Sequence, residues 1–271
     1  MRVNGLEAPY NGLQITTWFL FPLFLTGFFL LVPVPLPTSL AIPISVVYTI
    51  LVITSLHAGY QACSIDPIDV HLHRHVYINK GRGRTQREEG KQFCWVCQAH
   101  VNDDSKHCRF CEKCVDGFDH HCQWLNTCIG KHNYKYFFLA VKSIFGWLLV
   151  QTCAHGLIVV GWFVDNAKGT YLDVQQAVEN AGGSYPKDRL FISLEICWGL
   201  IAGFTLISIT QLLVFHVNLQ REGITTYDYI VRDGQRKRDK EEKAKKARKE
   251  KEAAKRGAPT AAASGNGRGG G

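Results

Sequence analysis

The chain has 271 residues, of which 46% are hydrophobic and 20% charged, and its formal net charge is +8. Its mean hydropathy is -0.06, so the averages alone would fit an ordinary soluble protein. The distribution of charge excludes that class. Asp, Glu, Lys and Arg are absent between Glu7 and Asp66, and the later runs 136–164 and 190–217 contain one charge each. Such long apolar runs are typical of membrane-spanning helices.

The first apolar stretch is long enough for two spans, because about 20 helical residues cross a bilayer core of about 30 Å. The segment 33–37, Pro-Val-Pro-Leu-Pro, interrupts it, and proline is unfavourable inside a helix. The sequence therefore predicts four transmembrane helices, at about residues 14–32, 40–60, 137–164 and 191–217. A cleaved signal peptide is the alternative for the first run, but such a peptide has a basic start and a short apolar core.

Basic residues are concentrated between the second and third predicted helices and after the fourth. Eleven Lys and Arg residues lie from Arg74 to Lys135, whereas the loop from Asp165 to Arg189 has three. The positive-inside rule therefore predicts a cytosolic N-terminus, a cytosolic segment between helices two and three, and a cytosolic tail. The predicted parts are two helices, a cysteine-rich domain, two further helices and a basic tail, at 1–62, 63–135, 136–218 and 219–271.

The tail from Arg232 onwards contains fourteen basic and six acidic residues, so its net charge equals the +8 of the whole chain. It has no apolar periodicity and ends in a stretch rich in Gly and Ala, which indicates a largely disordered or partly helical arm. Attraction to anionic membrane lipid is one interpretation of its charge. Nucleic-acid binding is not expected, because no recognised fold or interleaved aromatic residues accompany the basic residues.

The segment between helices two and three contains seven of the ten cysteines, in the pattern C-x2-C-x9-H-C-x2-C-x2-C-x4-D-H-H-C-x5-C. In a reducing compartment, two cysteines separated by two residues indicate a metal site rather than a disulfide. Two tetrahedral zinc sites need eight ligands, which six cysteines and two histidines would supply. One cysteine and one histidine then remain without a metal.

The surplus residues leave more than one interpretation open. A purely structural zinc module needs only the eight ligands, since metal can take the place of an apolar core. A catalytic thiol needs a base and a group that orients the base, and Asp119-His120 directly precede the extra cysteine. A metal transporter would need paired ionisable groups inside the membrane, where His155 has no evident partner. A zinc scaffold of the ubiquitin-ligase type would lack the spare Asp, His and Cys.

Residues 94–137 resemble the cysteine-rich domain of the DHHC protein acyltransferases, whose family name is the run Asp119-His120-His121-Cys122. The other residues at the family spacing are Cys94, Cys97, His107, Cys108, Cys111, Cys114, Cys128, Asn133 and Phe137. The domain also lies between the second and third of four helices, as in the family. The resemblance covers about residues 14–230.

Two short elements outside the domain extend the resemblance, with departures. Asp66-Pro67 resembles the family's Asp-Pro-Gly element, but Ile68 replaces the glycine. The run 225–228 resembles the Thr-Thr-x-Glu element, but Asp228 replaces the glutamate. Gln123 also stands where many members have proline. These changes leave the expected catalytic residues intact.

The resemblance implies roles for individual residues. One zinc ion is expected on Cys94, Cys97, His107 and Cys114, and a second on Cys108, Cys111, His121 and Cys128. Cys122 is the expected nucleophile, His120 its base and Asp119 the residue that orients the base. Thr225 and Thr226 are expected at the site of the acyl-coenzyme A co-substrate, with one of them steadying Asp119.

The resemblance also implies the fold and the activity. The expected fold is an α-helical integral membrane protein with four transmembrane helices and a cytosolic two-zinc domain between helices two and three. The expected reaction transfers a long-chain acyl group from palmitoyl-coenzyme A to cysteine thiols through an acyl-enzyme on Cys122. The expected partners are fatty acyl-coenzyme A, membrane lipid and membrane-associated proteins with cytosolic cysteines. The expected location is an endomembrane, either the endoplasmic reticulum or the Golgi.

Overall fold

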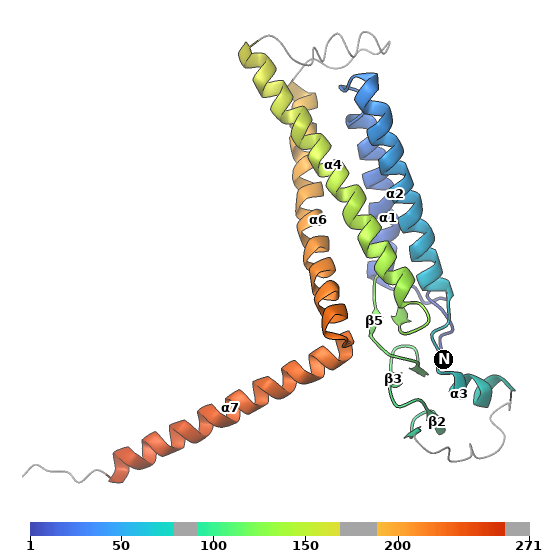
Figure 1. Cartoon of the computed structure of the whole chain (residues 1–271), viewed down its shortest axis with the longest axis vertical. Helices are drawn as coiled ribbons and strands as arrows, with labels where there is room; N and C mark the ends of the chain where they lie inside the picture. Colours follow the sequence, from blue (N-terminus) through green and yellow to red (C-terminus); the bar gives the residue numbers. More distant parts are fainter. Residues whose placement is uncertain (79–90, 169–188, 258–271) are drawn as a thin grey trace, which may run out of the picture. The chain divides into compact units, whose positions relative to one another are not determined.

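The computed structural model describes residues 1–78, 91–168 and 189–257 (Figure 1). Most of the predicted loop between the third and fourth helices, 169–188, and the end of the tail, 258–271, lie outside the described residues. The chain divides into two units, Met1–Thr226 and Tyr227–Gly271.

The four predicted spans are long helices in the first unit, and they are α1 (Gly12–Leu31), α2 (Thr38–Ser64), α4 (Tyr134–Lys168) and α6 (Arg189–Glu222). All four are long and apolar enough to cross a membrane. The prediction of a four-span α-helical membrane protein is therefore confirmed. The Asn11 side chain caps the start of α1 by accepting a hydrogen bond from the Leu13 N–H (2.9 Å), and Pro33 follows its end.

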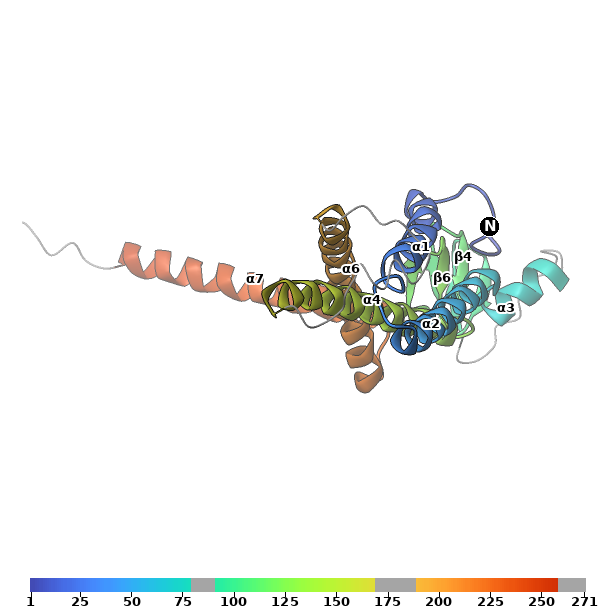
Figure 2. The same cartoon turned by 90° about the horizontal axis from the view of Figure 1, so that it is seen from above.

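Aromatic side chains fill the core of the helix bundle. Helix α4 packs against both α2 and α6 and lies between them (Figure 1, Figure 2). Phe28 of α1 stacks on Tyr48 of α2 with ring centroids 3.6 Å apart. Gly27 allows Trp198 of α6 to approach α1, because a Cβ at this glycine would lie 2.2 Å from the indole ring. These contacts join α1 to both α2 and α6.

A buried polar pair connects α4 to α6 inside the bundle. The Nδ1 of His155 lies 2.6 Å from the Oε2 of Glu195, and neither side chain is more than 1% exposed. The sequence left His155 without a partner, because 40 residues separate the two positions. Ionisable groups within a membrane are tolerated when they pair with each other.

Three two-stranded antiparallel hairpins lie between α2 and α4, and they are β1–β2 (Gln92–Cys94, Ala99–Val101), β3–β4 (Lys106–Cys108, Lys113–Val115) and β5–β6 (His120–Cys122, Thr127–Ile129). The hairpins repeat every 14 residues, since Gln98, Glu112 and Asn126 adopt the same left-handed backbone in the three turns (φ 52°, 53° and 53°). Isolated hairpins are at best marginally stable in water. Their stability must come from contacts beyond their own strands.

A short segment connects α2 to the hairpins through α3 (Val70–His73) and the π-helical turn η1 (Arg74–Ile78). Asp69 is fully buried and caps α3 with one carboxylate oxygen. Its other oxygen accepts hydrogen bonds from the Asn102 N–H (2.9 Å) and the Ser105 hydroxyl (2.6 Å). Ile68, which departs from the family glycine, is buried and bridges to Val115 of β4. This departure therefore contributes to the apolar core of the hairpin region.

The second unit contains helix α7 (Thr226–Gly257), which begins at the last residue of the first unit. Of the two alternatives that the sequence left open for the tail, the described residues adopt the helical one. Ala, Glu, Lys and Arg are strong helix formers. Ion pairs one turn apart, Asp233–Lys237 (2.7 Å) and Arg248–Glu252 (3.0 Å), add to their preference. A helix that is polar on all sides has no apolar periodicity, so the pattern gave no signal.

Candidate active site and metal centres

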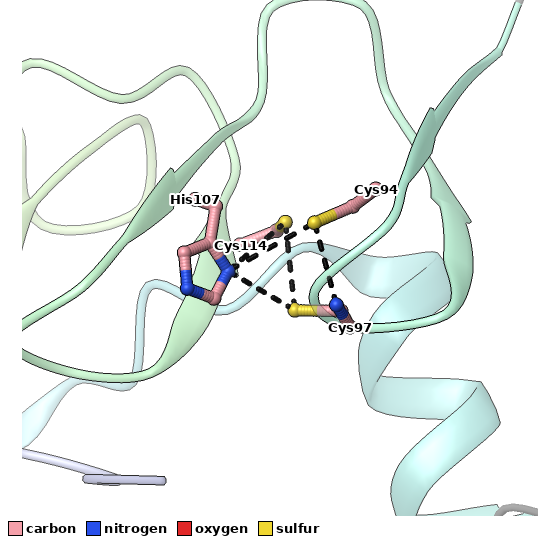
Figure 3. Close-up of side chains that lie close together, drawn as sticks. All are labelled: Cys94, Cys97, His107 and Cys114. Atoms are coloured by element: carbon pink, nitrogen blue, oxygen red, sulfur yellow. Dashed lines mark hydrogen bonds between the residues drawn. The ribbon is translucent and has the colours of Figure 1, made fainter.

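Two hairpins bring four side chains together in a first cluster, which consists of Cys94, Cys97, His107 and Cys114 (Figure 3). Their ligand atoms all lie within 4.8 Å of one another. The Cys97 Sγ is 3.2 Å from the His107 Nδ1 and 3.8 Å from the Cys114 Sγ. A tetrahedral zinc ion, with Zn–S bonds of about 2.3 Å, separates two sulfur ligands by about 3.8 Å. The first cluster therefore fits a closed zinc site.

A second cluster joins hairpin β3–β4 to hairpin β5–β6, and it consists of Cys108, Cys111, His121 and Cys128. Its ligand atoms also lie within 4.8 Å of one another. The Cys111 Sγ is 3.4 Å from both the His121 Nδ1 and the Cys128 Sγ. Three cysteines and a histidine are again the donors of a structural zinc site. The structure thus groups the eight predicted ligands into the two predicted sets.

The 14-residue repeat explains why one cysteine remains outside the clusters. In the first two hairpins, both cysteines of the turn join a histidine and a cysteine of the following hairpin. The third turn has Cys122 at the position of Cys108, but Leu125 at the position of Cys111. The described chain then continues into α4 instead of a fourth hairpin. The spacing of 14 residues in the sequence could have shown this repeat, but counting ligands alone missed it.

The predicted catalytic residues lie within hydrogen-bonding distance of one another. The Nδ1 of His120 is 2.6 Å from the Oδ2 of Asp119. The Thr226 backbone N–H donates to the Oδ1 of Asp119 (2.9 Å), and its hydroxyl donates to the Oδ2 (2.8 Å). His120 is also hydrogen-bonded to Cys122. Thr226, which the sequence did not distinguish from Thr225, therefore contacts the carboxylate.

These hydrogen bonds outweigh the effect of burial on two pKa values. Burial disfavours the charged forms of both His120 and Asp119. Hydrogen bonds to Asp119 and Cys122 nevertheless raise the pKa of His120 to about 9. Hydrogen bonds from His120 and Thr226 hold the pKa of Asp119 below its usual value. The arrangement therefore favours an imidazolium between a carboxylate and the sulfur of Cys122.

Cys122 lies in an apolar environment where the hairpins meet the membrane helices. It is 7% exposed and belongs to a cluster with Ala62 of α2, and with Phe137 and Val141 of α4. Leu213 of α6 packs against the same cluster. A thiol in this position adjoins the apolar ends of three helices that are long enough to cross a membrane.

Asn133 fixes the third hairpin to the helices. Its buried amide donates to the backbone carbonyls of Ala62 (3.0 Å) and Cys128 (2.9 Å). Its side-chain oxygen accepts from the Gly130 N–H (2.9 Å). The sequence singled out Asn133 by its spacing, and the structure gives it a positioning role between β6 and α2.

The first nine residues contact the hairpins, and sequence reasoning missed this arrangement. The Arg2 N–H donates to the Cys111 carbonyl (2.9 Å), and the Lys113 amine donates to the Val3 carbonyl (2.8 Å). The same buried amine pairs with Asp66. A Cβ at Gly5 would lie 2.2 Å from the Leu125 carbonyl oxygen. No sequence motif marks these contacts, because most of them use backbone atoms.

Comparison with known proteins identifies the family of the chain. A sequence model described as DHHC palmitoyltransferase matches residues 87–233, which is more than half of the chain. Palmitoyltransferase ZDHHC11 of Mus musculus is 31% identical over 246 residues, which cover 85% of this chain and 71% of that protein. The chain therefore belongs to the DHHC palmitoyltransferase family.

Two plant relatives match over the central part of the chain. Probable protein S-acyltransferase 22 of Arabidopsis thaliana is 43% identical over 145 residues, which are 53% of this chain and 23% of that protein. Probable protein S-acyltransferase 20 of the same plant is 37% identical over 139 residues, or 51% of this chain and 19% of that protein. The chain thus matches about a fifth of the length of these two relatives.

Proposed function

We propose that this protein is a protein S-acyltransferase that moves a long-chain fatty acyl group, such as palmitoyl, from acyl-coenzyme A to cysteine thiols of other proteins. One observation carries the proposal. Cys122 lies outside both metal clusters, is hydrogen-bonded to His120 and is packed against the ends of the membrane helices. A purely structural zinc module has no use for this arrangement.

In the first half-reaction, the Cys122 thiolate attacks the thioester carbonyl of acyl-coenzyme A. The carbon–sulfur bond to coenzyme A breaks, a new thioester forms on Cys122, and the coenzyme A thiolate leaves. His120 acts as the base that has taken the proton of Cys122, and it can return that proton to the departing thiolate. Asp119 and Thr226 keep His120 in place, because the carboxylate binds the Nδ1 and the threonine binds the carboxylate.

In the second half-reaction, a substrate cysteine attacks the acyl-enzyme. Its thiol loses a proton to His120, the acyl group passes to the substrate sulfur, and Cys122 leaves as a thiolate. One thioester replaces another of similar energy in each half-reaction, so no nucleotide hydrolysis is required. The expected substrates are membrane-associated proteins with cytosolic cysteines, and membrane lipid surrounds the four helices.

The two clusters are proposed to bind structural Zn²⁺. A closed Cys3His site leaves no open position for a substrate or for an activated water. The ions would therefore stabilise the three hairpins, with the first cluster joining hairpins one and two and the second joining hairpins two and three. Zinc would then contribute to the reaction by holding Cys122 in position.

The charge pattern supports a proposed orientation, with the N-terminus, the hairpins and the tail on the cytosolic side of the endoplasmic reticulum or Golgi membrane. The basic tail is proposed to be attracted to anionic lipid on that side. Protease added to sealed microsomes should remove the tail beyond Arg232. Protection of the tail would contradict the orientation.

The activity can be tested with the purified full-length chain and an alkyne-tagged analogue of palmitoyl-coenzyme A. We expect one label per chain, removal of the label by hydroxylamine, and release of one free coenzyme A for each label. Peptide mass spectrometry should locate the label at Cys122, and Cys122→Ser should accept no such label. An unlabelled wild-type protein, or a hydroxylamine-sensitive label that remains in the variant, would contradict the proposal.

A further inference from the structure

A buried histidine beside the candidate active site has no part in the reaction as proposed. His216 lies near the end of α6 and is 2% exposed. Its ring centroid is 5.8 Å from that of His120 and 5.0 Å from that of Phe137. The Phe137 ring is in turn edge-on to His120, at 5.1 Å. The His120 ring thus packs against two aromatic rings in addition to its hydrogen bonds.

His216 is itself held by Tyr134, the first residue of α4. The tyrosine oxygen lies 3.2 Å from the Nδ1 of His216. The side chain of Gln220, one turn further along α6, is also hydrogen-bonded to Tyr134. Because the Gln220 amide can donate to the tyrosine oxygen, the tyrosine proton remains available for the Nδ1 of His216. These hydrogen bonds join the start of α4 to the end of α6 beside His120.

The segment from His216 in α6 to Thr226, the first residue of α7, therefore reaches both members of the Asp119–His120 pair. Ten residues after His216, beyond a turn at Gly223 with a left-handed φ of 65°, Thr226 donates two hydrogen bonds to Asp119. These bonds fix the carboxylate. Hydrogen bonds to Asp119 and Cys122 still leave the His120 ring free to rotate about the line between its two partners, and a productive geometry needs neighbours that lock the side chain.

We propose that His216 is a positioning residue for this reaction, anchored by Tyr134, and that it fixes the plane of the His120 ring so that the Nε2 points at the Cys122 thiol. The inference rests on the proposed function, since His216 acts through His120. Phenylalanine at position 216 would keep an aromatic ring but lose the hydrogen bond to Tyr134. Tyr134→Phe would remove the same hydrogen bond from the other side.

The test compares His216→Phe, Tyr134→Phe and the double variant with the wild-type protein. The rate of acyl-enzyme formation at saturating acyl-coenzyme A should fall about tenfold in each single variant, which is part of the 10² to 10⁴-fold that a positioned base supplies. The acyl-coenzyme A concentration for half-maximal rate and the zinc content should not change. The double variant should be no slower than either single variant, because all three lose the same hydrogen bond.

A second measurement separates this inference from the proposed function. Iodoacetamide alkylation of Cys122, followed by peptide mass spectrometry without acyl-coenzyme A, should slow in the same variants even if the wild-type protein transfers no acyl group. Tyr60→Phe is the control, because it removes an exposed hydroxyl on α2, and it should leave both rates unchanged. Single variants within twofold of the wild-type rate, additive losses in the double variant, or loss of zinc would each overturn the proposal.

Discussion

Hairpins β3–β4 and β5–β6 have the same length, the same strand register and a left-handed residue at the same place in the turn. Both pair a histidine with a cysteine across the strands, as His107↔Cys114 and His121↔Cys128. They differ in the turn, where β3–β4 has Cys108 and Cys111 but β5–β6 has Cys122 and Leu125. Zinc knuckles need two thiols, so the change from cysteine to leucine leaves a thiol that can react.

The two residues that precede the histidine of each metal cluster differ as well. Ser105-Lys106 precede His107, whereas Asp119-His120 precede His121. A carboxylate and an imidazole at these positions supply the base that a thiol nucleophile needs. Under the proposed function, a few residue differences therefore distinguish a catalytic hairpin from the metal-binding hairpins that would hold it in position.

Removing a ligand of the second cluster should have the largest effect. Cys108→Ala should lose about one zinc per chain by elemental analysis, because metal-binding energy here is folding energy. Hairpin β5–β6 would lose its attachment, so acyl-enzyme formation should fall by at least about 100-fold. The matched variant Cys94→Ala also loses one zinc but keeps the second cluster, and should fall only about tenfold. Equal losses in both variants would show that the two clusters are equally coupled to Cys122.

Restoring the missing cysteine should convert the third hairpin toward a metal site. Leu125→Cys creates a C-x2-C pair that includes Cys122, so added zinc should slow acyl-enzyme formation about tenfold by occupying the nucleophile. A chelator at a concentration that leaves the structural ions bound should reverse the loss. Leu125→Val is the control and should be insensitive to zinc. If added zinc slowed Leu125→Cys no more than Leu125→Val, the third turn would not be equivalent to the turns that form the metal clusters.

Loss of the Thr226 hydroxyl should weaken the Asp119–His120 pair. A hydrogen bond to a charged group contributes about 1.5 to 3 kcal/mol, and each 1.36 kcal/mol is tenfold in rate. Because the Thr226 N–H still donates to Asp119, Thr226→Val should slow acyl-enzyme formation by the lower end of this range, about tenfold. Thr226→Ser keeps the hydroxyl and should remain close to wild type.

The pH dependence of the same variant gives a second result. The pKa of His120 is raised to about 9, so the imidazolium is present at neutral pH and is lost as the pH rises through that value. In Thr226→Val, Asp119 would stabilise the His120 imidazolium less. The pKa of His120 would fall, and the alkaline limb of the pH profile should move to lower pH. An unshifted limb, or equal rates in the valine and serine variants, would argue against this role of the hydroxyl.

The smallest effect is expected where the N-terminal residues touch the third hairpin. A Cβ at Gly5 would lie 2.2 Å from the Leu125 carbonyl oxygen, while a Cβ at Gly12 would meet no atom within 4 Å. Gly5→Ala should lower the free energy of unfolding by about 1 to 3 kcal/mol, as overpacking does, and slow the reaction only a few-fold. Gly12→Ala should not be destabilised, and thermal unfolding in detergent would measure both. Equal unfolding temperatures would contradict the importance of the Gly5 contact.

The sequence predicted the helices and the ligand sets because both depend on local patterns. Uninterrupted apolar runs define the four spans, and the spacing of Cys and His defines the two clusters. The His155–Glu195 pair and the packing of His216 on His120 join residues far apart in the chain, so no local pattern predicts them. The sequence left the tail as either disordered or partly helical, because charged residues, unlike an apolar face, leave no periodic signal.

The adjacent histidines are proposed to have opposite roles, since His121 belongs to a metal cluster and His120 is hydrogen-bonded to Asp119 and Cys122. Zinc content and acyl label measured on the same protein samples test this proposal most directly. His120→Ala should keep two zinc ions and lose most of the hydroxylamine-sensitive label, part of which should return at higher pH as thiolate forms without the base. His121→Ala should lose about one zinc and become protease-sensitive. Loss of a zinc from His120→Ala, with both ions retained in His121→Ala, would contradict the account.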